Sequence, residues 1–157
     1  MSTALTITTA AMSALGVAAE THTVRFKNHC GRGTPKLVHE GKVLSTGGSY
    51  THNGPLISAI AYLDTGCLLN GEKCSTVETT LKNPTSPGAG SSTDVTLIPP
   101  HKFNVKTGFS YYSGCESTGN TCASANCCPQ HAFCKPTDYE CQRQCQVNNV
   151  NLEITFC

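Results

Sequence analysis

Two acidic residues are the first candidates for chemistry in this chain of 157 residues. Glu78 lies in segment 75–81 and Asp94 in segment 94–98, and both segments read as strands. Two carboxyl groups can hydrolyse a glycosidic bond, with retention when about 5–5.5 Å apart and with inversion at about 6.5–9.5 Å. If the two segments are neighbouring strands, Glu78 and Asp94 face one groove. The alternative is a pair of outward-facing strand acids in water.

Tyrosines are the next candidates, because their rings can stack on sugars. Tyr50, Tyr62, Tyr111 and Tyr112 are available, whereas the chain has no tryptophan. Adjacent residues of a strand point to opposite faces, so we expect at least one of Tyr111 and Tyr112 at the surface. Both are predicted to contact ligand, with packing at the rim of a core as the alternative.

A group of cysteines with one histidine raises the question of a metal site. The group comprises Cys122, Cys127, Cys128, His131 and Cys134. These spacings differ from those of zinc fingers and ribbons, and an oxidising compartment would convert the thiols to disulfides. We therefore expect no metal and no cofactor. No thiol stands out as an activated nucleophile, and a Gly-x-Ser-x-Gly turn is absent.

The 11 cysteines all follow an apolar N-terminal stretch, residues 5–19, that ends in Val17-Ala18-Ala19. We interpret residues 1–19 as a secretory signal peptide and residues 20–157 as one domain. The stretch has no Lys or Arg before it, so a membrane anchor or a disordered tail are the alternatives. Because the number of cysteines is odd, either one thiol is unpaired or two chains share a disulfide. We expect a monomer unless the odd cysteine forms a bridge between chains.

Charge argues against two classes of partner. The formal net charge is +1, without runs of one sign, which disfavours nucleic acid and anionic membranes. No later segment is apolar enough to span a bilayer. Asn83-Pro84-Thr85 is blocked as a glycosylation site by its proline, whereas O-linked sugar near 85–93 remains open.

Short strands separated by turns predict an all-β sandwich. Segments 36–38 and 42–44 flank Glu40-Gly41 as a hairpin, and the apolar run 56–63 reads as a central strand, with a short buried helix as the competitor. Further strands are expected at 75–81, 94–98, 101–105 and 109–112.

The two ends of this domain share a pattern. Val24 and Phe26 alternate with charged residues before Cys30, and segment 150–156 alternates in the same way before Cys157. The simplest arrangement bonds Cys30 to Cys157 and closes nearly the whole domain, which the loop-entropy model values at roughly 4–5 kcal/mol.

Residues 115–145 hold seven of the 11 cysteines with little apolar material, so we expect loops held by disulfides. One helix is predicted there, with Asp138 as N-cap and residues 139–146 as its body, which would place Cys141 and Cys145 on one face.

A set of short motifs follows in order from residue 23 to residue 157. They are a strand into Asn-x-Cys at 28–30, Thr-Gly-Cys at 65–67, Val-Glu-Thr-Thr-Leu at 77–81, Asp-Val-Thr-Leu at 94–97, Phe-Asn at 103–104, Gly-Cys at 114–115 and a final Thr-Phe-Cys at 155–157. In this order they resemble the thaumatin-like superfamily, and most closely the small fungal secreted proteins called "glycopeptide". The second, disulfide-rich domain of full-length members is mostly missing, as is a clear match to their cleft arginine.

The resemblance implies an antiparallel, disulfide-rich β-sandwich with its first and last cysteines bonded. It further implies the bridges Cys67–Cys74 and Cys115–Cys145, and two more among the remaining cysteines, which stay unassigned: Cys122, Cys127, Cys128, Cys134 and Cys141. In the family, the positions of Glu78 and Asp94 belong to an acidic cleft, and some members bind or cleave β-1,3-glucans.

We therefore predict a secreted binding protein that recognises cell-wall or cell-surface glycan through an acidic cleft. One alternative is a weak endo-β-1,3-glucanase that uses Glu78 and Asp94. The other is a structural or host-interacting secreted protein without a small ligand.

Overall fold

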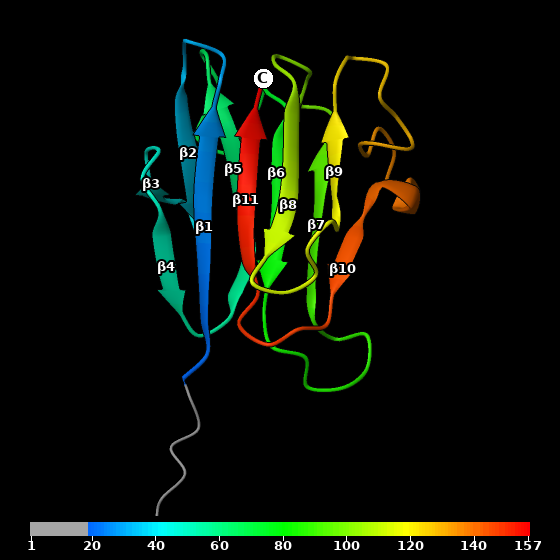
Figure 1. Ribbon diagram of the computed structural model, residues 1–157. Coiled ribbons are helices and arrows are strands. Elements are labelled where there is room, and N and C mark those ends of the chain that lie inside the picture. The colour runs from blue at the N-terminus through cyan, green and yellow to red at the C-terminus, as the bar shows by residue number, and fades with distance from the viewer. Residues whose placement is uncertain (1–18) are drawn as a thin grey trace, which may run out of the picture.

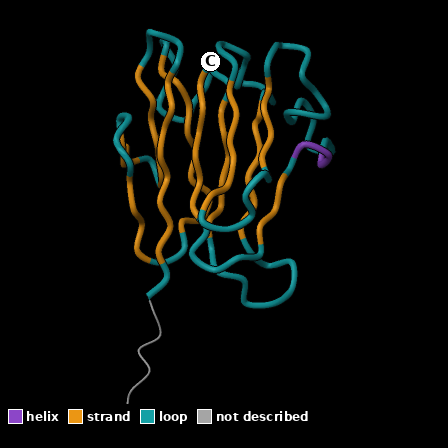
Figure 2. The backbone as a smooth tube through the Cα atoms, in the orientation of Figure 1, coloured by secondary structure: helices purple, strands orange, loops and turns teal. Residues whose placement is uncertain are grey.

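The computed structural model describes residues 19–157 and contains two β-sheets packed face to face (Figure 1; Figure 2). The expected signal segment lies outside the described residues, apart from Ala19. No helix in residues 19–157 is long and apolar enough to cross a membrane.

The first sheet, called sheet A, has the strand order β4-β1-β11-β8-β9. Its strands are β1 (Thr21–Asn28), β4 (Tyr50–Asn53), β8 (Thr107–Tyr112), β9 (Gly119–Cys122) and β11 (Asn151–Phe156). The second, sheet B, has the order β10-β7-β6-β5-β2-β3. Its strands are β2 (Thr34–His39), β3 (Lys42–Ser45), β5 (Leu56–Asp64), β6 (Thr76–Leu81), β7 (Ser91–Thr96) and β10 (Arg143–Cys145).

The core lies between the sheets and is built from alternate residues of each strand, as the period-2 patterns predict. Leu152, Ile154 and Phe156 of β11 are fully buried against Val77 of β6 and Val95 of β7. The intervening residues of β6 and β7 therefore point away from the core, onto the outer face of sheet B.

The Cys30–Cys157 bridge is present, and the strand pairing explains it. β1 and β11 pair in parallel, with Asn28 opposite Phe156, so the C-terminal ends of both strands lie side by side. The cysteines that follow them lie 5.1 Å apart at Cα, within the range that a disulfide requires. Every other pairing between the strands of residues 19–157 is antiparallel.

The other bridges expected from the resemblance are present as well, at Cys67–Cys74 and Cys115–Cys145. The unassigned cysteines form Cys122–Cys127 and Cys128–Cys134. Cys141 is the one cysteine of the described chain without a bridge, and it is buried.

Two expected elements are wrong. Segment 139–146 is a short 3₁₀ helix, η1 (Tyr139–Cys141), followed by strand β10. Asp138 does not cap a helix, because its carboxylate accepts hydrogen bonds from the backbone of Cys134 and Lys135 instead. β10 pairs with β7, so tertiary pairing outweighs the local helix signal.

Segment 101–105 is a loop rather than a strand. The side chain of Asn104 holds it in place, accepting from the backbone N–H of Ser75 at 3.0 Å and donating to the carbonyl of Leu63 at 3.1 Å. Val105 is buried here as a strand residue would be, which explains the misleading alternation.

Candidate functional site

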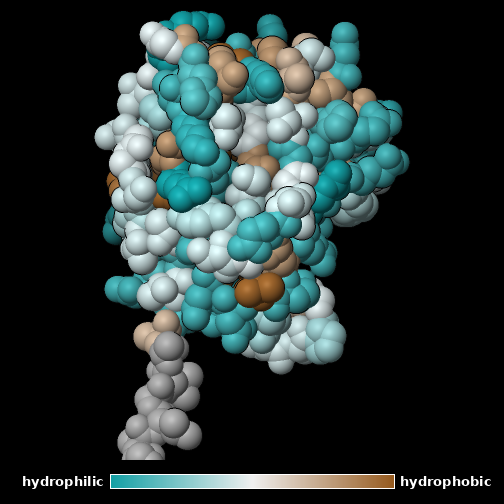
Figure 3. All heavy atoms as spheres, in the orientation of Figure 1, coloured by the Kyte–Doolittle hydropathy of each residue, from teal (hydrophilic) through white to brown (hydrophobic). Residues whose placement is uncertain are grey.

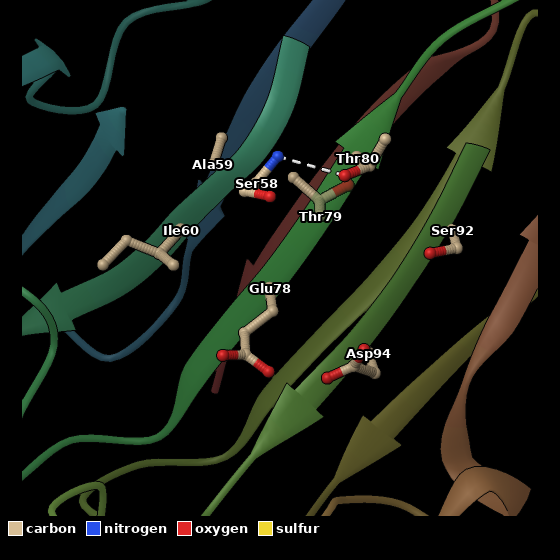
Figure 4. Close-up of a pocket in the computed structure, with 8 residues that line it drawn as sticks. All are labelled: Ser58, Ala59, Ile60, Glu78, Thr79, Thr80, Ser92 and Asp94. Carbon is tan, nitrogen blue, oxygen red and sulfur yellow. Dashed lines mark hydrogen bonds between the residues drawn. The ribbon is translucent and has the colours of Figure 1, made fainter. Parts of the chain in front are cut away.

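Glu78 and Asp94 are direct partners on neighbouring strands. β6 and β7 pair so that Glu78 lies opposite Asp94, and both side chains project from the outer face of sheet B. Cβ atoms of such a pair are about 5 Å apart. Figure 4 shows the two carboxyl groups pointing toward one another from β6 and β7.

The pair belongs to a row of side chains that crosses sheet B at right angles to its strands. Val38 of β2 pairs with Ile60 of β5, Ile60 pairs with Glu78, and Glu78 pairs with Asp94. The row changes from apolar at β2 to acidic at β7, and it forms the floor of a depression in the outer face.

A groove of about 250 Å³ lies over the acidic end of this row (Figure 4). Most of its polar lining consists of hydroxyl and carboxyl groups. Its lining residues are Ser58, Ala59, Ile60, Glu78, Thr79, Thr80, Ser92 and Asp94.

A β-bulge in β5 shapes one wall of the groove. The register between β5 and β6 shifts between Leu56 and Ala59, and Ser58 has a φ of 55°. Its backbone N–H donates to Thr80 Oγ1 at 3.0 Å, a bond drawn in Figure 4. A bulge redirects side chains, and here it places Ser58 on the groove.

The two carboxyl groups have different surroundings. Glu78 is exposed, whereas Asp94 is only 7% exposed and its Oδ1 is buried without a hydrogen-bond partner. Burial raises the pKa of Asp94 to about 7, and the neighbouring carboxyl of Glu78 acts in the same direction. The side chain of Gln142 acts in the opposite direction and lowers the pKa of Asp94.

Near pH 7, the buried carboxyl of Asp94 therefore carries a proton in about half of the molecules. A protonated carboxyl donates and a carboxylate accepts, so the pair offers both kinds of hydrogen bond to a ligand. Such a pair suits the recognition of hydroxyl groups, which also donate and accept.

The buried thiol of Cys141 lies near Asp94 but offers no nucleophile. Burial, followed by the charge of Asp94, raises the pKa of this thiol to about 12. The sulfur donates to the Asp138 carbonyl at 3.1 Å. A thiol with a raised pKa stays protonated and unreactive.

The predicted role of Tyr111 in ligand binding is wrong, because its ring points into the core. Tyr111 is 2% exposed, and its hydroxyl donates to the Arg143 carbonyl at 2.9 Å and lies 3.0 Å from Thr93 Oγ1, a second hydrogen-bond partner. It ties sheet A to β7 and β10 beneath the groove.

Tyr112 lies on the far side of the sandwich from Glu78. It projects from the outer face of sheet A, where the guanidinium of Arg25 stands 3.8 Å from its ring centre. Arg25 in turn is paired with Glu153 at 2.7 Å. This face is largely hydrophilic or neutral (Figure 3), and its tyrosine cannot join the groove on sheet B.

The cysteine and histidine group of residues 122–134 is taken up by disulfides, and no group of three or more metal-binding side chains occurs in residues 19–157. Sequence reasoning missed the groove hydroxyls of Ser58, Thr80 and Ser92, and it missed Gln142. A polar residue inside the apolar run 56–63 was the available signal for Ser58, whereas nothing local marked Gln142.

Comparisons with known proteins agree with this architecture. No protein-family model and no curated protein sequence matches the chain. Among solved structures, a thaumatin-like xylanase inhibitor superposes with a TM-score of 0.56 at 18% identity, covering 85% of this chain and 98% of that one. Two facing sheets, five disulfides and this superposition together show that the chain has a thaumatin-like fold.

Proposed function

We propose that this protein is a secreted, non-catalytic binding protein that holds a cell-wall β-glucan in the groove over Glu78 and Asp94. The cross-strand carboxyl pair, set among the hydroxyl groups of Ser58, Thr80 and Ser92, is the observation that carries the proposal. Sugar hydroxyls both donate and accept, which matches a pair whose buried member, Asp94, has a pKa of about 7.

The contact between the carboxyl groups favours binding over hydrolysis. Glu78 and Asp94 are adjacent cross-strand partners whose carboxyl groups point toward one another, so a sugar ring does not fit between them (Figure 4). Hydrolysis requires the two groups to flank the scissile bond, at least about 5 Å apart. The neighbour's printed name describes an inhibitor, which is a binding function of that protein.

Five disulfides in 139 described residues support the secreted location. Reducing compartments keep most thiols unpaired, whereas extracellular domains are often dense in bridges.

Sedimentation with insoluble β-1,3-glucan tests the proposal. The wild-type protein should sediment with the polysaccharide and release no reducing ends. Glu78→Gln preserves the shape of the side chain but removes its charge, and loss of a charge-assisted hydrogen bond should weaken binding about tenfold. Glu116→Gln, the same change in an exposed turn beyond β8, is the matched control and should bind as the wild type does.

A wild-type protein that stays in solution, or a Glu78→Gln variant that sediments equally well, would contradict the proposal. If the protein does not bind glucan but binds a glycan-degrading enzyme, the result would instead support an inhibitor function, as in the printed name of the structural neighbour.

The second candidate is a weak endo-β-1,3-glucanase. It is favoured by the raised pKa of Asp94, about 7, which gives a proton donor beside the exposed carboxyl of Glu78. Time-dependent release of reducing ends from soluble β-1,3-glucan, lost in Asp94→Asn, would establish it.

A further inference from the structure

A second depression adjoins the groove and is not explained by the acidic pair. It measures about 270 Å³ and lies over β5, β2 and the β2–β3 turn. Ser58, Ile60 and Glu78 line both depressions, so the two form one continuous channel. The channel crosses β7, β6, β5 and β2, which at the usual strand spacing is about 14 Å.

The chemistry of the second depression differs from that of the first. Its floor is the apolar end of the cross-strand row, Val38 and Ile60. Its rim is polar and includes Asn70 and His101. A sugar ring has an apolar face of C–H groups and an edge of hydroxyls, and this arrangement matches both.

His101 is fixed with one ring nitrogen available. Nδ1 lies 3.0 Å from the carbonyl of Gly71. A carbonyl only accepts, so Nδ1 carries the hydrogen, and Nε2 of the neutral ring is left as an acceptor. No protein partner of Nε2 occurs among the hydrogen bonds of residues 19–157, and His101 lines the channel.

We propose that the channel holds a linear glycan segment of about three sugar units rather than a single sugar, with a second subsite over Val38 and Ile60 in which His101 Nε2 accepts a hydrogen bond from a ligand hydroxyl. This inference rests on the proposed glycan binding and goes further by fixing ligand length and naming a specificity-determining residue. Glu78 is shared by both subsites, so a chain bound at the acidic pair continues over β5 toward β2.

Calorimetric titration with β-1,3-linked gluco-oligosaccharides of defined length tests the inference. Affinity should rise at least about tenfold from the disaccharide to the tetrasaccharide and then level off. His101→Asn keeps an amide donor for the Gly71 carbonyl but withdraws the second nitrogen. It should weaken tetrasaccharide binding about fivefold, the value of one neutral hydrogen bond, and leave disaccharide binding unchanged.

Two further variants distinguish loss of the hydrogen bond to His101 Nε2 from a general change in the structure of the loop. His101→Gln places an amide near the position of Nε2 and should recover most of the tetrasaccharide affinity. His29→Asn makes the same substitution at an exposed position directly after β1 and should have no effect. Unfolding free energies equal to that of the wild type in both His101 variants would show that the loop of Gly71 is intact.

The outcomes separate the two proposals. Equal affinity for the disaccharide and the hexasaccharide, or a His101→Asn variant that binds the tetrasaccharide as the wild type does, would overturn the second subsite and leave glycan binding standing. An absence of binding to every oligosaccharide would overturn both.

Discussion

At the scale of single residues, the structure pairs an exposed carboxyl with a buried one. Glu78 is exposed to solvent, whereas the Oδ1 atom of Asp94 is buried and has no hydrogen-bond partner in the protein. A buried carboxyl without compensation favours its protonated form. Asp94 therefore imposes a cost on the fold whenever it is ionised, and such residues are more common at functional sites than elsewhere.

Asp94→Asn should stabilise the protein in a pH-dependent manner. The pKa of Asp94 rises from 3.8 to about 7 on folding, so the folded state binds the proton more tightly. The penalty is absent below pH 3.8, grows through the interval and is complete above pH 7. Urea unfolding should show a gain in free energy of about 2–4 kcal/mol at pH 8 and little at pH 4.

Glu78→Gln is the companion variant for this measurement. It leaves Asp94 buried but removes the neighbouring charge, so the gain should have the same sign and a smaller size. A gain in Asp94→Asn that is equal at pH 4 and pH 8, or a loss at pH 8, would show that the buried carboxyl is not the source.

At the scale of elements, the β5 bulge and the register of β5, β6 and β7 create the site. The bulge requires Ser58 to adopt a φ of 55°, which is unfavourable for any residue but glycine. Strain of this kind persists where the surroundings demand it, here through the bond from Ser58 N–H to Thr80 Oγ1.

Ser58→Gly should stabilise the fold and weaken glycan binding together. Glycine relieves a left-handed conformation that costs about 1 kcal/mol, while the lost hydroxyl removes a groove contact. The matched control is Ser92→Gly, at an extended position in β7, which should destabilise by about 0.5–1 kcal/mol. Unfolding in urea and glucan titration of both variants measure the effects. Equal destabilisation by the two substitutions would contradict the strain at Ser58.

The sequence predicts the strands that carry Glu78 and Asp94. It does not predict the bulge at Ser58 or the strand β10 that pairs with β7. Segments 75–81 and 94–98 are β-branched and alternate; the first corresponds to β6, whereas the second overlaps β7 only at residues 94–96. The bulge at Ser58 depends on how β5 pairs with β6, which is a non-local choice. The helix expected at 139–146 failed because β10 gains its stability from β7, far away in sequence.

The two tyrosines also show that local alternation does not determine which sheet a strand joins. Alternation correctly implied that Tyr111 and Tyr112 face opposite ways, but it could not tell which sheet held them. β8 belongs to sheet A, so one ring enters the core and the other reaches the face opposite the groove.

At the scale of the whole molecule, the sandwich is closed by one long-range disulfide. Cys30 and Cys157 are separated by 127 residues, whereas Cys67 and Cys74 are separated by 7. The loop-entropy model gives the longer closure about 5 kcal/mol and the shorter about 2.5 kcal/mol. The end-to-end bridge is therefore the main covalent support of the sheets that present the groove.

Replacement of both cysteines of a bridge by serine should follow this order. The Cys30→Ser/Cys157→Ser pair should lose about 2 kcal/mol more unfolding free energy than the Cys67→Ser/Cys74→Ser pair. Urea unfolding of the two double variants measures the difference. The reverse order would mean that local constraint at the Cys67–Cys74 loop matters more than closure of the chain.

The central claim is that glycan occupies the outer face of sheet B, and backbone NMR titration with a β-1,3-linked glucohexaose tests it most directly. Amide shifts should cluster on Ile60, Glu78 and Asp94, at the cross-strand row, with little change at Tyr112 on sheet A. Shifts centred on Tyr112 and Arg25, with the cross-strand row unchanged, would contradict the account.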